Sequence, residues 1–316
     1  MTDESETDHR SELWAGIAPS MLVAAADLAD FRIPGGPNSR LAHWEPREPT
    51  LRWFRSYLQL AADSMSPDER TILAHVSNIG LGNPVTVVTA TNPMEPTKTE
   101  LNLDYLYAAE ETAFLQRGLQ SVGGQPAIRY VIELGAGFGR TAHVILSAFE
   151  NIQLYTIVDL PETLSLSRIY LAHVLPTTLF EKLQFVNAED IGSLFPPDQR
   201  LADLAIQIDG LQEMDESTID HYFERVFTKV RFVFLSNPVG KYLPQAAGIQ
   251  GVPPQVIEQV LNLGRCHVVL DPWNATDLEA ARPAYLSAYT PEGYEILLDE
   301  ASRLRPLYQH VLFQRH

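Results

Sequence analysis

The sequence predicts an α/β fold in which a doubly wound sheet makes up most of the chain and follows a helical region. From Tyr130 onward, short apolar runs alternate with helical segments, a texture typical of a parallel sheet covered by helices. The composition, 45% hydrophobic and 20% charged over 316 residues, is that of a folded globular protein. We therefore expect a frayed polar tail over 1–11, a helical region over 12–120 and the sheet domain over 121–316.

The helical region has several separate segments. Apolar spacing predicts helices over 22–30 and 51–63. Ser66-Pro67-Asp68-Glu69 then places a hydroxyl at the N-cap, proline at the first helical position and a carboxylate two positions later, which predicts a capping box. The stretch 81–97 is rich in Gly, Pro, Asn and Thr and predicts an ordered loop, after which a helix is expected over 103–119.

The sheet domain is expected to hold five strands and a final antiparallel pair. The strands are predicted at Tyr130–Leu134, Leu154–Val158, Leu183–Asn187, Leu204–Ile208, Phe232–Ser236, Tyr294–Asp299 and Tyr308–Gln314. Intervening helices are predicted to begin near Thr141, Glu162, Ser217 and Pro254. The run Cys-His-Val-Val-Leu-Asp at 266–271 also has the pattern of a strand, so His267 and Asp271 would not share a helical metal-binding face.

Charge and cysteine content exclude several classes of partner. Lys and Arg number 23 against 40 Asp and Glu, a formal net charge of -17, which disfavours nucleic acid. Cys266 is the single cysteine, so the chain can form neither an internal disulfide nor a CxxC-based zinc or iron–sulfur site. Neither an export signal nor a membrane-spanning run is evident, which predicts a cytoplasmic protein that does not enter membranes.

A glycine-rich turn follows the first predicted strand of the sheet domain. Residues 131–141 read Val-Ile-Glu-Leu-Gly-Ala-Gly-Phe-Gly-Arg-Thr, an apolar strand, the turn and a helix start. A dinucleotide-binding GxGxxG would need glycine at position 140, where this chain has Arg140. The pattern here is GxGxG, which lets the backbone approach a ligand closely but disfavours a nicotinamide oxidoreductase.

Acidic residues end the strands that follow the glycine turn. Asp159 lies 20 residues past Gly139 at the end of the second strand, where a carboxylate can accept both hydroxyls of a ribose. The third strand leads into Ala188-Glu189-Asp190, and the fourth into Asp209-Gly210-Leu211-Gln212-Glu213-Met214. Open α/β sheets bind ligands at this carboxyl edge, so these residues are candidates for a binding site.

Together these residues resemble a class I S-adenosylmethionine-dependent methyltransferase over about 130–316. Within that superfamily the chain is similar to the sugar O-methyltransferases of antibiotic biosynthesis. The motifs that carry the resemblance are Glu-Leu-Gly-Ala-Gly-Phe-Gly-Arg (133–140), Val-Asp-Leu-Pro-Glu (158–162), Leu-Gln-Glu-Met (211–214) and Ser-Asn-Pro (236–238). The chain departs from the family at Asp209-Gly210, where family members often carry Asn or Ser.

The resemblance implies a seven-stranded Rossmann-like methyltransferase sheet with its last strand antiparallel, and S-adenosyl-L-methionine as cofactor. It implies that the N-terminal helical region is a lid over the acceptor pocket and a contact for a homodimer. Glu133 and Gly135 would approach the methionine part, Asp159 the ribose, and Glu189 with Asp190 the adenine. The implied cofactor-binding residues are Glu133, Gly135, Ala136, Gly137, Gly139, Asp159, Leu160, Ala188, Glu189 and Asp190.

Methyl transfer to a hydroxyl needs alignment of the reactants and a general base near the acceptor. Candidates for the base are Glu213, His221 and Asp209, at or after the carboxyl end of the fourth strand. Candidates for binding the acceptor are Tyr107, Asn237 and Lys241. We expect no metal, although carboxylates scattered over loops could form a magnesium site that leaves little trace in a sequence.

The expected function is therefore O-methylation of a small molecule, a deoxysugar hydroxyl in specialised-metabolite biosynthesis. One alternative keeps the cofactor and methylates carbon, in an aromatic ring or an alkene of a natural product. Another is a protein with the methyltransferase fold that binds ligands without catalysis. The chain contains no GxSxG elbow, P-loop or HExxH, which excludes the commonest hydrolase and nucleotide-hydrolysing functions.

Overall fold

The computed structural model describes residues 12–17, 28–29, 31–32, 51–90, 98–122, 127–191, 202–247 and 251–316. The predicted tail over 1–11 and most of the predicted helix over 22–30 lie outside them; Leu28 and Ala29 are in a short 3-10 turn. Contacts group the chain into two compact units. We call Pro19–Phe185 the N-terminal unit, and Met1–Ala18 with Val186–His316 the C-terminal unit.

The large sheet has seven strands in the order β5-β4-β3-β6-β7-β9-β8. These strands are β3 (Tyr130–Leu134), β4 (Leu154–Asp159), β5 (Leu183–Asn187), β6 (Leu204–Ile208), β7 (Phe232–Pro238), β8 (Tyr294–Ala301) and β9 (Tyr308–Arg315). β3 with β4 and β6 with β7 are parallel pairs, whereas β9 is antiparallel to both β7 and β8. All seven predicted strands, the antiparallel pair included, are confirmed, and so is the predicted α/β fold class.

The N-terminal unit is built around a helix that is buried on almost every face. This helix, α4 (Leu103–Gln120), packs against α3 (Pro67–Ala74) and α5 (Arg140–Ala148). Its buried positions include Asp104, Glu110, Glu111 and Thr112, so the unit must supply polar partners inside its core. The remaining helices of this unit are α2 (Leu51–Asp63), α6 (Pro161–Val174) and α7 (Thr177–Phe180).

The predicted capping box at the start of α3 is confirmed. Ser66 Oγ accepts the Glu69 N–H at 3.2 Å, and the Ser66 N–H donates to Glu69 Oε2 at 2.9 Å. These two bonds satisfy donors that the first turn of a helix otherwise leaves unpaired.

Replacing the Ser66 hydroxyl should therefore destabilise the N-terminal unit. We expect Ser66→Ala to lower the free energy of unfolding by about 1 kcal/mol, measured by urea titration. Ser56→Ala is the matched control, because Ser56 is exposed inside α2 and its hydroxyl bonds only to the Arg52 carbonyl of the preceding turn. Equal stability of the two variants would contradict a stabilising role for the cap.

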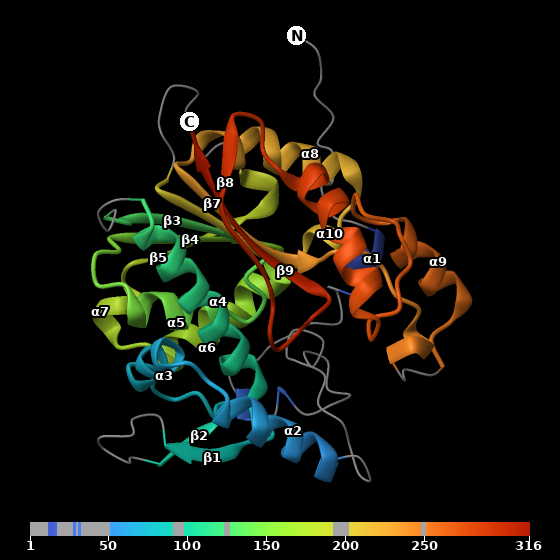
Figure 1. Cartoon of the computed structure of the whole chain (residues 1–316). Helices are drawn as coiled ribbons and strands as arrows, with labels where there is room; N and C mark the ends of the chain where they lie inside the picture. The colour runs from blue at the N-terminus through green and yellow to red at the C-terminus, as the bar shows by residue number, and fades with distance from the viewer. Residues whose placement is uncertain are drawn as a thin grey trace. The chain divides into compact units, whose positions relative to one another are not determined.

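Two predictions about local structure were wrong. The stretch over 81–97 is not all loop, because β1 (Val87–Ala90) pairs antiparallel with β2 (Lys98–Leu101), and α2 packs on β1 (Figure 1). The run at 266–271 is not a strand: it forms one isolated bridge, between Val269 and Lys241. The hydrogen bonds at this bridge go to the Lys241 backbone alone, so no ladder develops.

In the C-terminal unit, β9 lies beside β7 (Figure 1). The register of this pair places Tyr308 opposite Pro238. The start of β9 therefore lies at the carboxyl end of β7. The helices of this unit are α1 (Glu12–Ile17), α8 (Glu216–Arg225), α9 (Pro254–Asn262) and α10 (Ala275–Tyr289). α10 was not predicted. It contains Pro283, which removes one backbone donor from the helix interior.

Candidate functional site

In the N-terminal unit, the glycine turn after β3 is hydrogen-bonded to the acid that ends β4. The Gly137 N–H donates to Asp159 Oδ2 at 3.0 Å, and the Leu160 N–H donates to Asp159 Oδ1 at 2.8 Å. The Gly135 N–H donates to the Val158 carbonyl at 2.9 Å. The two motifs that the sequence separates by 20 residues therefore form one structure at the carboxyl ends of two parallel strands.

Two of the glycines are required for different reasons. Gly135 has φ +72°, and a side chain there would point into open space, so the backbone is accessible to a ligand. Gly139 has φ +97° and is the N-cap of α5, and a Cβ atom there would lie 2.8 Å from Leu171 of α6. Gly135 thus leaves room for a bound molecule, while Gly139 allows α5 to pack closely against α6.

Both acids of this turn have a raised pKa. Burial raises the pKa of Glu133 to about 7, although Tyr155, whose hydroxyl donates to Glu133 Oε2 at 2.8 Å, and Arg140 favour the charged form. Burial also raises the pKa of Asp159 to about 7, against the backbone N–H groups of Leu160, Gly137 and Ala136. Perturbed carboxylic acids beside an open glycine turn are a common property of binding sites.

Arg140 occupies the position where a dinucleotide-binding protein has its third glycine. Its guanidinium points into α4: one nitrogen donates to the Asp104 carbonyl at 3.0 Å and another to Glu111 Oε1 at 3.2 Å. The side chain therefore holds the start of α5 against α4. Position 140 thus serves the packing of α5 on α4, and its side chain is part of that contact.

In the C-terminal unit, Asp209 directly follows β6 and has φ +62°, a left-handed conformation that few residues other than glycine adopt. Tyr308 donates its hydroxyl to Asp209 Oδ1 at 2.6 Å, and Arg305 lies 3.7 Å from Oδ2. Strained backbone of this kind persists where the surroundings hold it, often at binding sites. Neither Tyr308 nor Arg305 was predicted as a site residue.

Glu213 lies nearby in the chain, in the 3-10 turn Leu211–Glu213, and is half-buried. The indole N–H of Trp14, on α1, donates to Glu213 Oε2 at 3.0 Å. Lys241 is 4% exposed and donates from Nζ to the Gln212 carbonyl at 2.6 Å. Burial lowers the pKa of Lys241 to about 8, with Glu213 opposing the shift.

The other predicted base and acceptor residues of this unit have structural partners. Asn237 is fully buried, and its Oδ1 accepts the Leu211 N–H at 3.1 Å, so it fixes the start of the turn that carries Glu213. His221 lies within α8, with its ring edge-on to Tyr222. Whether either residue contacts an acceptor stays a prediction.

The predicted site residues not yet placed are the adenine contacts and Tyr107. Ala188 is buried, and Glu189 and Asp190 are exposed in the 3-10 turn after β5. Tyr107 is buried in α4, with the Arg140 guanidinium 5.9 Å from its ring centroid. Their roles also stay predictions.

Within the ranges described above, no group of three or more His, Cys, Asp or Glu side chains could hold a metal ion. Over the same ranges, no helix has the length and hydropathy needed to cross a bilayer.

No protein-family model and no curated protein matches the chain. Among solved structures, it is similar to the mitomycin 7-O-methyltransferase MmcR at 14% identity and a TM-score of 0.40, over 67% of this chain and 57% of that one. The glycopeptide N-methyltransferase MtfA, complexed with sinefungin, is similar at 18% identity and a TM-score of 0.42, over 66% of this chain and 94% of that one.

An O-methyltransferase family protein from Burkholderia thailandensis is similar at 17% identity and a TM-score of 0.38, over 67% of this chain and 60% of that one. The match thus spans less than two thirds of the mitomycin and Burkholderia proteins.

Proposed function

We propose that this protein is an S-adenosylmethionine-dependent methyltransferase that methylates a hydroxyl of a small molecule. The observation that carries the proposal is the joining of the open turn at Gly135 to the Asp159 carboxylate through the Gly137 N–H. A nucleoside ligand without a phosphate needs such a close backbone approach and an acid for its ribose.

The residues present fit this cofactor. Open space at Gly135 admits a ligand against the backbone, and the half-buried Asp159 offers a carboxylate to two ribose hydroxyls. Position 140 holds an arginine whose side chain bonds to α4. The turn therefore lacks the third glycine that pyrophosphate binding uses. Glu133, buried below the turn, would balance the positive charge of the methionine part.

When bound, S-adenosylmethionine supplies an electrophilic methyl group with a thioether as leaving group. The chain's own residues would bind, align and accept a proton. Gly135 and Gly137 would hold the cofactor by their backbone, and Asp159 its ribose. Ala136, Leu160, Ala188, Glu189 and Asp190 are proposed as the other contacts, with the last two toward the adenine.

The carboxylates of the C-terminal unit are proposed to handle the acceptor. Tyr308 and Arg305 fix Asp209, which suits it to hold an acceptor hydroxyl. Glu213 accepts a hydrogen bond from a neutral indole, and we assign it the removal of the proton from the reacting hydroxyl. His221 is the remaining candidate for the base.

A sugar is the proposed acceptor class. Two carboxylates and Tyr308 can each bond a hydroxyl, and a deoxysugar presents several hydroxyls at fixed positions. Lys241, Asn237 and Tyr107 are proposed as further acceptor contacts. We also propose that residues 12–120 form a helical lid and residues 121–316 the sheet domain, that the protein is a homodimer, that it uses no metal, and that it is cytoplasmic.

The raised pKa of Asp159 predicts that affinity for S-adenosylhomocysteine increases with pH. Binding ribose hydroxyls needs the carboxylate, and with a pKa of about 7 it is mostly protonated at pH 6 and mostly ionised at pH 8. We expect the protein to bind S-adenosylhomocysteine about tenfold more tightly at pH 8 than at pH 6. At pH 6, binding should release a proton from the Asp159 carboxyl group. Calorimetry in buffers of different ionisation enthalpy measures both quantities.

Two variants separate the contributions to this pH dependence. Glu133→Gln should keep most of it, because Asp159 still titrates. Asp159→Asn should remove most of it. Affinity that is constant from pH 6 to pH 8 in the wild type would contradict the assignment of Asp159.

Transfer of an isotopically labelled methyl group tests the reaction itself. The protein is incubated with methyl-¹³C S-adenosylmethionine and a panel of deoxysugar glycosides, free sugars and electron-rich aromatics, and the products are examined by NMR. We expect methoxy signals from a sugar. Label on carbon would establish the alternative C-methyltransferase, and cofactor binding without transfer to any acceptor would favour the catalytically inactive binding protein.

A further inference from the structure

We propose that Arg32 is a positioning residue for the glycine turn, which it supports through Phe138 and α4; this rests on the proposed binding of S-adenosylmethionine at that turn. Arg32 lies more than 100 residues before the turn in the sequence and belongs to the same unit. Its side-chain hydrogen bonds and its ion pair go to Asn102, Asp104 and Tyr170, none of which is a predicted site residue, so its polar influence on the turn passes through these neighbours.

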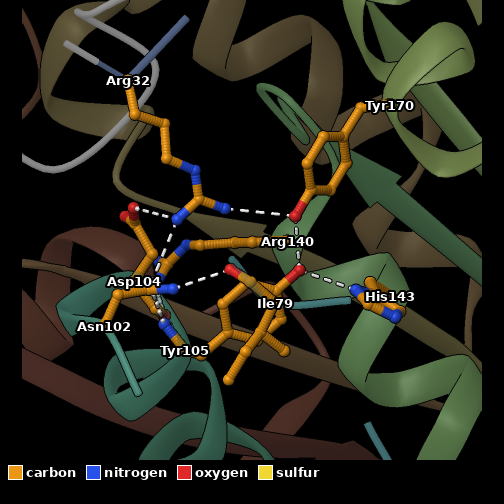
Figure 2. Close-up of polar contacts among 8 residues, drawn as sticks. All are labelled: Arg32, Ile79, Asn102, Asp104, Tyr105, Arg140, His143 and Tyr170. Carbon is orange, nitrogen blue, oxygen red and sulfur yellow. Dashed lines mark hydrogen bonds and ion pairs between the residues drawn. The ribbon is translucent and has the colours of Figure 1, made fainter. Parts of the chain in front are cut away.

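Arg32 is a buried cation with several partners. It is 1% exposed. One guanidinium nitrogen donates to Asn102 Oδ1 at 3.1 Å and lies 3.3 Å from Asp104 Oδ2, and the other donates to the Tyr170 hydroxyl at 3.1 Å (Figure 2). A buried ion pair is weak support for stability, because apolar residues of similar size often serve as well. Stability alone therefore does not explain why an arginine is buried at position 32.

The first link from Arg32 to the turn is the ring of Phe138, which lies between Gly137 and Gly139. The guanidinium carbon of Arg32 lies 4.7 Å from the centroid of this ring, within cation–π range. Phe31 and Tyr170 meet the same ring edge-on, at 5.3 Å and 5.0 Å between centroids. Three neighbours thus fix Phe138, and with it the backbone that presents the Gly137 N–H to Asp159.

The second link passes through Asp104. Its carboxylate pairs with Arg32, and its carbonyl accepts from Arg140, the first residue of α5 (Figure 2). Phe138 and Arg140 flank Gly139. The partners of Arg32 therefore hold the turn on both sides of this glycine.

The third link is a directed chain of hydrogen bonds. Arginine only donates, so Tyr170 accepts from Arg32 and can donate to the Tyr105 hydroxyl at 2.6 Å. The Tyr105 oxygen lies 2.6 Å from Nδ1 of His143 on α5 (Figure 2). If Tyr170 donates to Tyr105, the Tyr105 hydrogen is left for this nitrogen. Burial and the charge of Arg32 lower the pKa of His143 to about 3, which keeps its ring neutral and able to accept. Arg32 thus sets the donor-to-acceptor direction of this series of hydrogen bonds, which ends on α5, the helix that follows the turn.

A double-mutant cycle tests the coupling. Arg32→Lys, Phe138→Leu and the double variant are titrated with S-adenosylhomocysteine at pH 8, and the melting temperature of each is recorded. Leu58→Ala, in the buried face of α2, is the control for general destabilisation of the same unit. We expect Arg32→Lys and Phe138→Leu each to weaken the binding of S-adenosylhomocysteine by about 2- to 30-fold more than Leu58→Ala does. This difference should remain after the affinities are compared for a similar decrease in melting temperature.

The double variant should lose less affinity than the product of the two single losses, because both changes disturb one contact. Additive losses, or wild-type affinity in Arg32→Lys and Phe138→Leu, would overturn the positioning role. Lack of binding by the wild-type protein would instead overturn the proposed function, and the positioning role with it.

Discussion

Replacing Asp159 with alanine is expected to weaken the binding of S-adenosylhomocysteine by about 10²- to 10⁴-fold. Two hydrogen bonds from ribose hydroxyls to a carboxylate are worth about 1.5–3 kcal/mol each. The same change also removes the acceptor of the Gly137 and Leu160 N–H groups, so the turn loses its anchor to β4. Calorimetric titration at pH 8 measures the loss.

Glu150→Ala is the matched control for this variant. Glu150 is an exposed acid of the same unit and precedes β4, whereas Asp159 ends it. We expect the control to bind as the wild type does. An Asp159→Ala variant that folds and binds within about threefold of the control would show that the acid does not hold the ligand.

The second large effect is expected at Glu213. If Glu213 removes the proton from the acceptor hydroxyl, Glu213→Gln should lower kcat by about 10²- to 10⁴-fold. The affinity for S-adenosylhomocysteine should not change, because Glu213 is not assigned to the cofactor. Methyl-transfer kinetics with the sugar acceptor identified by labelling provide kcat and KM.

Asp209 and Glu216 distinguish catalysis from binding and from a change of charge. Asp209→Asn should mainly raise KM for the acceptor, because Tyr308 and Arg305 hold this side chain in a binding position. Glu216→Gln, at an exposed position three residues past Glu213, should leave both constants unchanged. A Glu213→Gln enzyme with wild-type kcat would exclude Glu213 as the base and leave His221 to be tested.

Local signals in the sequence predicted the sheet and the capping box well. The strands from Tyr130 to Asn187 are apolar runs bounded by turns, and Ser66 with Glu69 satisfy a pattern that depends on four consecutive residues. The glycine turn and Asp159 were also predicted, because a strand, a turn and a strand end constrain their spacing.

The wrong or missing predictions involve weak local patterns. β1 and β2 have four residues each, too few for alternation to be recognised among Pro, Asn and Thr. The helix α10 was not predicted, and it contains Pro283, a residue that weakens the local signal for a helix. The run at 266–271 has the composition of a strand, yet its one β-bridge joins Val269 to Lys241.

Contacts between distant residues could not be predicted from local patterns at all. Arg32 and Asp104 are 72 residues apart, and Tyr308 and Asp209 are 99 residues apart. The antiparallel pairing of β8 with β9 was predicted. The pairing of β9 with β7, whose register places Tyr308 at the carboxyl end of β7, was not. That register was the one signal from which Tyr308 could have been inferred.

Calorimetric titration of the wild-type protein with S-adenosylhomocysteine, followed by the nicotinamide dinucleotides, tests the central claim most directly. We expect S-adenosylhomocysteine to saturate one site with a Kd on the order of micromolar, and the dinucleotides to give no binding heat. Binding of a dinucleotide, or no binding of S-adenosylhomocysteine, would contradict the assignment of the glycine turn and Asp159 to S-adenosylmethionine.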